Sequence, residues 1–137
     1  MAIKKKKLSE AVKTSNVISA IEGLIPLGFQ QIINGAGIYK CSIPKLDQRI
    51  SILVKSGNAG QGGWFLLMLS GVTKVVKCLV GTNFHLQVYY KINGTSVDFW
   101  IKGRESTFMT MLVLQDDYTP SFVKSSIPGD GIEITIK

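Results

Sequence analysis

The chain contains few of the residues on which metal sites and catalytic sites depend. Its 137 residues include one histidine and two cysteines. Cys41 and Cys78 lack a CxxC spacing and have no cluster of histidines nearby, so we expect two buried free thiols and no metal. His85 has no partner at a spacing typical of a catalytic triad, and we expect it to be inert. The sequence thus predicts neither a metal nor another cofactor.

Acidic residues are also scarce, with nine in the whole chain. Asp116 and Asp117 follow an apolar run and are more typical of a turn than of an acid/base pair. The glycine-rich stretch SGNAGQGGW, residues 56–64, joins two strand-like runs and is not followed by a helix. A phosphate-binding loop needs a helix N-terminus at that point, so this stretch predicts a hairpin loop. We therefore expect a protein that is not an enzyme.

Long apolar runs are missing as well. The longest, around residues 64–69, is the size of a strand, whereas a membrane-spanning helix needs about 18 apolar residues. The stretch after the first lysines is broken by polar residues and does not resemble a secretory signal. These features predict synthesis in a cytoplasm without membrane insertion. The chain is nevertheless 45% hydrophobic and 18% charged, which favours a surface partly covered by partners.

Positive charge is concentrated at the N-terminus. The net charge is +7, and the first thirteen residues hold five lysines and one glutamate. Lys4, Lys5, Lys6 and Lys7 form a basic arm that suits an acidic protein surface, nucleic acid or anionic lipid, or is a solvated terminus. The remaining lysines are scattered and form no basic stripe with aromatic residues, which speaks against nucleic acid.

Residues 8–25 are the one stretch with helical character, and Gly23 and Pro26 mark its end. Val17, Ile21 and Leu24 fall on one face at helical spacing. This stripe would dock on a sheet or on copies of itself. The sequence therefore predicts a basic arm with a short helical segment over residues 1–27, followed by a β domain over residues 28–137.

From Gly28 onward, short apolar runs alternate with turn residues. About nine runs of 5–8 residues are separated by Gly, Asn, Asp and Pro, a pattern typical of an antiparallel β-sandwich, here expected to be jelly-roll-like. Two of these runs flank Asn34-Gly35-Ala36-Gly37 and predict a hairpin.

The clearest hairpin signal is Asn93-Gly94. A two-residue type I′ turn there would place Ile92 opposite Thr95, Tyr90 opposite Val97 and Val88 opposite Phe99, on an apolar face that belongs in the core.

The other face of this hairpin would carry a mixed aromatic and polar set: His85, Gln87, Tyr89 and Trp100. Tyr and Trp combine apolar area with a polar group, which suits a subunit interface or a glycan-binding surface. The alternative is that a loop of the same chain covers Tyr89 and Trp100.

The run FHLQVYYKINGTSVDFWIKG, followed by the strand FMTMLVL, resembles the C-terminal β-sandwich modules of bacteriophage tail fibres and tailspikes. The stretches KKKLSEAV and IEGLIPL are similar to the start of phage attachment proteins. This resemblance implies a homotrimeric, non-enzymatic virion protein of a tail fibre, head fibre or capsid decoration, with a role in host attachment or receptor binding. It would be made in the host cytoplasm, bind other virion proteins through its basic arm, and have a host cell-surface glycan as a further candidate partner.

A second hypothesis is a carbohydrate-binding module of a bacterial cell-surface system. Tyr89 and Trp100 would then stack on sugars. A trimer favours the virion hypothesis, and a monomer that binds glycans favours the second.

Overall fold

The computed structural model describes residues 30–34, 37–57, 62–103 and 109–137, which form two antiparallel five-stranded sheets. The predicted all-β antiparallel class is confirmed. The basic arm and the predicted helical segment lie outside the described residues. No helix in the described part of the chain is long and apolar enough to cross a membrane.

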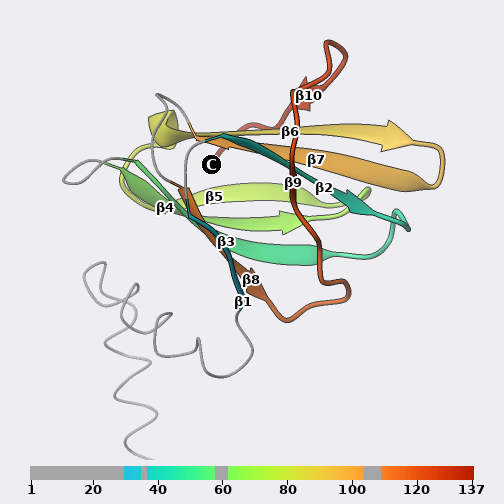
Figure 1. Ribbon diagram of the computed structural model, residues 1–137, viewed down its shortest axis with the longest axis horizontal. Coiled ribbons are helices and arrows are strands. Elements are labelled where there is room, and N and C mark those ends of the chain that lie inside the picture. The colour runs from blue at the N-terminus through green and yellow to red at the C-terminus, as the bar shows by residue number, and fades with distance from the viewer. Residues whose placement is uncertain (1–29, 35–36, 58–61, 104–108) are drawn as a thin grey trace, which may run out of the picture.

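Each sheet combines strands that are distant in the sequence (Figure 1). In spatial order, the first sheet consists of β1 (Gln30–Asn34), β8 (Met109–Leu114), β3 (Ile50–Ser56), β4 (Gly63–Leu69) and β5 (Lys74–Val80). The second consists of β10 (Ile132–Glu133), β6 (Leu86–Asn93), β7 (Ser96–Gly103), β2 (Ile38–Ile43) and β9 (Val123–Lys124). In the first sheet, β8 returns beside β3 of the consecutive strands β3, β4 and β5, which is the spatial order of a Greek key.

The two sheets face each other across one hydrophobic core. Alternate side chains point to opposite faces of a strand, and the inward ones are fully buried. The core takes Val54, Phe65 and Leu67 from the first sheet and Val88 and Phe99 from the second. The burial of Phe99 confirms the apolar face predicted for the hairpin.

The hairpin between β6 and β7 has a different register from the predicted one. Gly94-Thr95 form the turn and Asn93 lies opposite Ser96, so Tyr90 faces Phe99 instead of Val97. The turn thus lies one residue later than predicted, which moves every partner by two positions and leaves each side chain on its expected face. The side-chain amide of Asn93 donates to Asp98 Oδ2 at 2.5 Å, which helps to hold Asn93 in the strand.

The hairpin predicted around residues 34–37 is not formed, and that prediction is wrong. β1 pairs with β8 in the first sheet, whereas β2 pairs with β7 and β9 in the second. β2 pairs with β7 over six residues, whereas pairing with β1 would be limited to the five residues of that strand. Gly37 adopts φ +144°, a conformation that favours glycine, where the chain enters the second sheet.

The C-terminal segment joins the two sheets. Ile134 N–H donates to Val88 O at 2.8 Å in the second sheet. Further on, Lys137 N–H donates to Val76 O at 2.9 Å, and Cys78 N–H donates to Lys137 O at 3.0 Å. Residues 132–137 therefore pass from β6 to β5 and close one side of the core.

Candidate functional site

The outer face of the second sheet contains most of the side chains that the sequence singled out. The strand registers place Val123, Lys40, Trp100, Tyr89 and Glu133 in one row across β9, β2, β7, β6 and β10. Tyr89 therefore lies opposite Trp100, whereas the predicted register placed Gln87 there. The row faces away from the core, because its neighbours Cys41, Val88 and Phe99 along these strands point inward.

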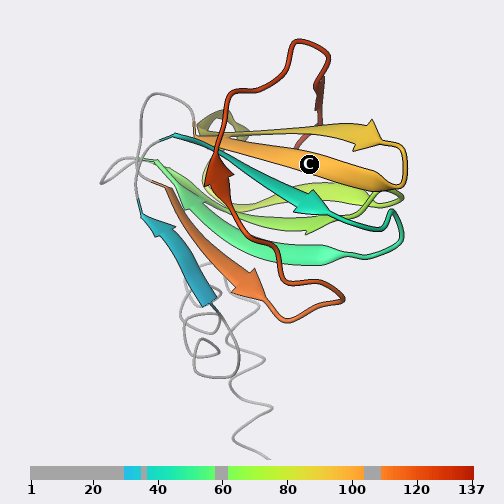
Figure 2. The same ribbon diagram turned by 45° about the vertical axis from the view of Figure 1, so that its right-hand side comes forward.

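Residues 125–131, here called the strap, cross this face above Trp100. They connect β9 to β10, at opposite edges of the sheet and at the two ends of the same row. Figures 1 and 2 show this segment, in red, passing in front of β7 and β6. The distance across four strand spacings is about 19 Å, which seven residues can span.

Trp100 is consequently only 4% exposed. The expectation that Trp100 is open to a partner is therefore wrong, and the alternative, cover by a loop of the same chain, is confirmed for Trp100. The Lys40 ammonium lies 5.6 Å from the centroid of its ring. The indole Nε1 is buried without a hydrogen-bond partner among the described residues.

The strap is held by a few polar contacts near its ends. Ser125 N–H donates to Ile38 O at 3.1 Å. Lys91 Nζ lies 2.9 Å from Asp130 Oδ2 in an exposed ion pair. The hydrogen bond from Lys91 lowers the pKa of Asp130 below its usual value.

Gln87 and Tyr89 form a half-buried hydrogen-bonded group beside the strap. Gln87 Nε2 lies 3.1 Å from Tyr89 Oη and 3.2 Å from Glu133 Oε2. These side chains lie near Trp100, as predicted, but their polar atoms bond to one another. Whether they bind a subunit or a glycan remains a prediction.

His85 is placed apart from this group. It lies in a short 3₁₀ turn, η2 (Asn83–His85), ahead of β6, and not on the outer face of the hairpin as predicted. Its ring packs edge-on against Phe84, with centroids 5.5 Å apart. The four predicted site residues, His85, Gln87, Tyr89 and Trp100, therefore do not lie together in one site.

Asp98 is a buried carboxylate on the outer face that the sequence analysis did not select. Its oxygens accept hydrogen bonds from Ser42 Oγ and Asn93 Nδ2, both at 2.5 Å, and Lys40 Nζ lies 3.7 Å away. Two hydrogen bonds and one ion pair connect this carboxylate to β2 and β6 and hold these strands beside β7. This arrangement suits a structural role better than proton transfer.

Both cysteines are free thiols, as predicted. Cys41 is fully buried, whereas Cys78 is only partly buried. Burial, reinforced by the negative charge of Asp98, raises the pKa of Cys41 to about 12. A thiol with so high a pKa carries almost no thiolate at neutral pH and is a poor nucleophile.

Asp116 forms the second polar cluster and joins two loops, in agreement with the predicted turn. Arg49 Nε lies 2.9 Å from Asp116 Oδ2, the Ser51 hydroxyl donates to the same oxygen, and Asp117 N–H donates to Oδ1 at 2.8 Å. Burial opposes ionisation, but these hydrogen bonds and the charge of Arg49 hold the pKa of Asp116 below its usual value.

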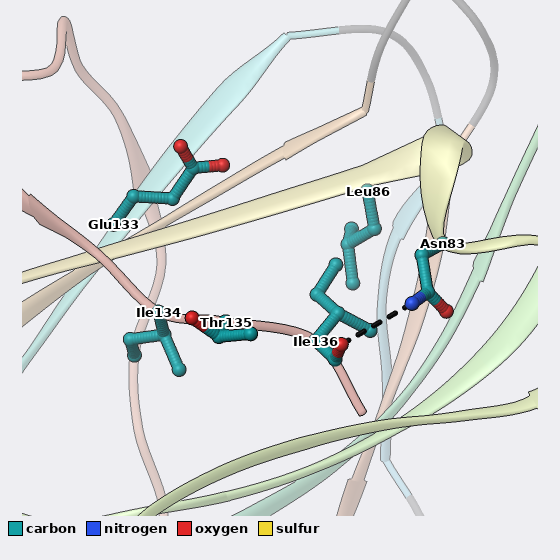
Figure 3. A pocket seen from close by; sticks show the side chains of 6 residues that line it. All are labelled: Asn83, Leu86, Glu133, Ile134, Thr135 and Ile136. Carbon is teal, nitrogen blue, oxygen red and sulfur yellow. Dashed lines mark hydrogen bonds between the residues drawn. The ribbon is translucent and has the colours of Figure 1, made fainter.

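A pocket of about 440 Å³ lies between the start of β6 and the C-terminal segment (Figure 3). It is lined by Asn83, Leu86, Glu133, Ile134, Thr135 and Ile136. The Asn83 side chain is occupied by a hydrogen bond to Ile136 O at 3.2 Å. Glu133, the one ionisable side chain of the lining, points away from Asn83. The lining therefore shows no convergent set of catalytic groups.

Metal-binding side chains do not gather in the described part of the chain either. Within it, no three His, Cys, Asp or Glu residues lie close enough together to hold a metal ion.

Several large apolar side chains are exposed near Tyr90 and in the turn between β4 and β5, a feature that the sequence analysis missed. Val72, Ile92 and Ile132 are 77%, 47% and 53% exposed. Lys74, two residues after Val72, places its ammonium 4.7 Å from the centroid of the Tyr90 ring. Ile132 pairs with Tyr90, and Ile92 follows it on the same face of β6.

The turn that carries Val72 and the tip of the β6–β7 hairpin lie at the same end of the two sheets (Figure 1). We call Val72, Ile92 and Ile132 the end patch. Because these residues come from three separate turns and strands, no single stretch of sequence could have marked them as a group.

Comparison with known proteins gives no relative for this chain. No family model matches the sequence, and no curated protein and no solved structure shows significant similarity to it.

Proposed function

We propose that the chain is a non-enzymatic structural protein of a bacteriophage particle, acting as a trimeric attachment module in a tail fibre, a head fibre or a capsid decoration. The resemblance of residues 84–114 and of the N-terminal stretch to phage fibre and attachment proteins supports this function. The two facing sheets, with a Greek-key strand order, suit the jelly-roll-like β-sandwich that the resemblance implies.

The end patch is the observation that carries the proposal. Three large aliphatic side chains from separate segments are exposed: Ile132 pairs with Tyr90, Ile92 lies two residues further along β6, and Val72 lies in the β4–β5 turn, at the same end of the sheets as the tip of the β6–β7 hairpin (Figure 1). Apolar groups gathered in this way favour a protein partner, and in a closed homo-oligomer the same patch meets its copies around the symmetry axis. The subunit contact is therefore proposed at the end patch instead of at Trp100, which the strap covers.

The basic arm supplies the proposed attachment to the particle. Lys4, Lys5, Lys6 and Lys7 are suited to an acidic surface on another virion protein, and salt would weaken that contact. The alternative function, a carbohydrate-binding module, needs an open aromatic platform. With Trp100 at 4% exposure, Tyr89 alone would have to supply it, so this function is less well supported.

The proposal is tested by mass spectrometry of gradient-purified phage particles from a lysate that contains this gene product. We expect the chain in the particle fraction, in a copy number that is a multiple of three. Replacing Lys4–Lys7 by alanine should remove the folded chain from the particles. Recovery of the unmodified chain only from the free protein fraction would contradict the proposal.

A further inference from the structure

The outer face of the first sheet is apolar, although it points away from the core. Ile52, Val54, Phe65 and Leu67 of its central strands belong to the core, so the alternate residues face outward. Most of these outward residues are aliphatic or Met: Leu53, Leu66, Met68, Leu112 and Leu114. A sheet face of this composition is typical of one that packs on another layer.

Three of these side chains form a continuous row. Leu112, Leu53 and Leu66 are direct cross-strand neighbours on β8, β3 and β4. Leu53 is 1% exposed and Leu112 is 4% exposed, yet neither is part of the core cluster between the sheets. Cross-strand neighbours cover only the flanks of a side chain, so burial this deep requires a layer above the row.

The described chain does not provide this layer. Of the connections that are described in full, those between β4 and β5 and between β6 and β7 are tight turns, those between β2 and β3, β5 and β6, and β8 and β9 pass from one sheet to the other, and the strap crosses the second sheet. The remaining long segment precedes β1, the edge strand of this same sheet. Gln31 of β1 lies opposite Leu112, so the chain enters this sheet beside the apolar row.

The length and pattern of the N-terminal segment match this face. Residues 8–25 as a helix would be about 27 Å long, and five strands are about 19 Å across. The linker over residues 26–29 can extend about 13 Å, enough for the chain to turn back over the sheet. Val17, Ile21 and Leu24 give the segment an apolar stripe at helical spacing.

We propose that residues 8–25 form an amphipathic helical segment that docks on the outer face of the first sheet of the same chain. The stripe formed by Val17, Ile21 and Leu24 covers the row of Leu112, Leu53 and Leu66. The domain then consists of three layers: the helical segment, the first sheet and the second sheet. The basic arm emerges beside the first sheet, on the opposite side of the molecule from the strap.

Hydrogen exchange of the full-length chain tests this docking. Ile21→Asp places a charge in the contact and should lower the protection of residues 8–25 by about 10-fold or more. Leu66→Asp, on the sheet side of the contact, should have the same effect. Ser19→Asp adds the same charge on the opposite face of the helical segment and should leave the protection unchanged.

Protection of β6 and β7, which are remote from this face, shows that each variant is folded. The measurement is repeated over a 100-fold range of protein concentration, over which docking within one chain should not change. Equal protection of residues 8–25 in Ile21→Asp and Ser19→Asp would overturn the inference. So would protection that disappears on dilution, because a second copy would then provide the cover.

Discussion

Trp100 shows how burial changes the role of a single residue. Its position on the outer face of the hairpin follows from the alternation of the strand, and the structure agrees with that position. Its cover comes from residues 125–131, which are distant in sequence and rich in Ser, Pro and Gly. No local pattern links the strap to Trp100, so the sequence left two alternatives open.

Trp100→Ala should therefore lower the free energy of unfolding by about 3–5 kcal/mol, as for other truncations of buried aromatic residues. Trp100→Phe should cost much less, because it keeps most of the ring and removes an indole N–H that has no partner among the described residues. Urea denaturation followed by circular dichroism gives both values. Phe84→Ala, at a half-exposed position, is the control. An unchanged unfolding midpoint in Trp100→Ala would contradict the observed burial.

Asp116 gives a prediction about pH. Its pKa in the folded protein lies below its value in the unfolded chain, so its contribution to stability is present at neutral pH and lost as the pH falls through the folded pKa. Asp116→Asn should cost about 1–3 kcal/mol at pH 7, because Arg49 and Ser51 lose a charged acceptor. Denaturation curves at pH 7 and pH 3 should show the difference from the unmodified chain shrinking in acid. If the difference in stability between Asp116→Asn and the unmodified chain grew in acid, the predicted direction of the pH dependence would be wrong.

At the scale of elements, local signals predicted which residues form strands better than which strands pair. The alternation in residues 86–102 identified both strands of the β6–β7 hairpin and both of their faces. Asn34-Gly35 also indicated a turn, but β1 and β2 lie in different sheets. Pairing depends on which strands lie side by side in the folded protein. The partner of β1 is β8 and a partner of β2 is β7, and both come from distant parts of the chain.

The hairpin turn itself can be tested with two glycines. Gly94 adopts φ +61° and has no atom within 4 Å of the position that a Cβ would occupy, so Gly94→Ala should cost about 1 kcal/mol through backbone strain alone. Gly129 in the strap also has open space around it and does not adopt a positive φ, so Gly129→Ala should be nearly neutral. Thermal denaturation of the two variants compares them directly. Equal melting temperatures would contradict the placement of the turn at Gly94-Thr95.

At the scale of the whole molecule, the sequence predicted the all-β class and the free cysteines but not the surfaces. The end patch is built from Val72, Ile92 and Ile132, which only the tertiary structure brings together. The basic arm, in contrast, is visible in the sequence and lies outside the described residues. It is proposed to act in attachment and not in folding.

Deletion of residues 1–7 should accordingly leave the melting temperature nearly unchanged. The same deletion should weaken binding of the chain to purified particles, and the binding of the full-length chain should fall as the salt concentration rises. Scanning calorimetry and a sedimentation binding assay measure the two effects. A truncated chain that is unfolded at room temperature would refute this division of roles.

The most direct test of the proposed trimer is sedimentation equilibrium of the full-length chain. We predict a mass of three copies of the 15.0 kDa chain, reduced to one copy when Ile92 and Ile132 are both replaced by asparagine. Val123→Asn changes a side chain that is 60% exposed outside the end patch, and it should leave the trimer intact. A full-length chain that sediments as a 15.0 kDa monomer at all concentrations would contradict the account.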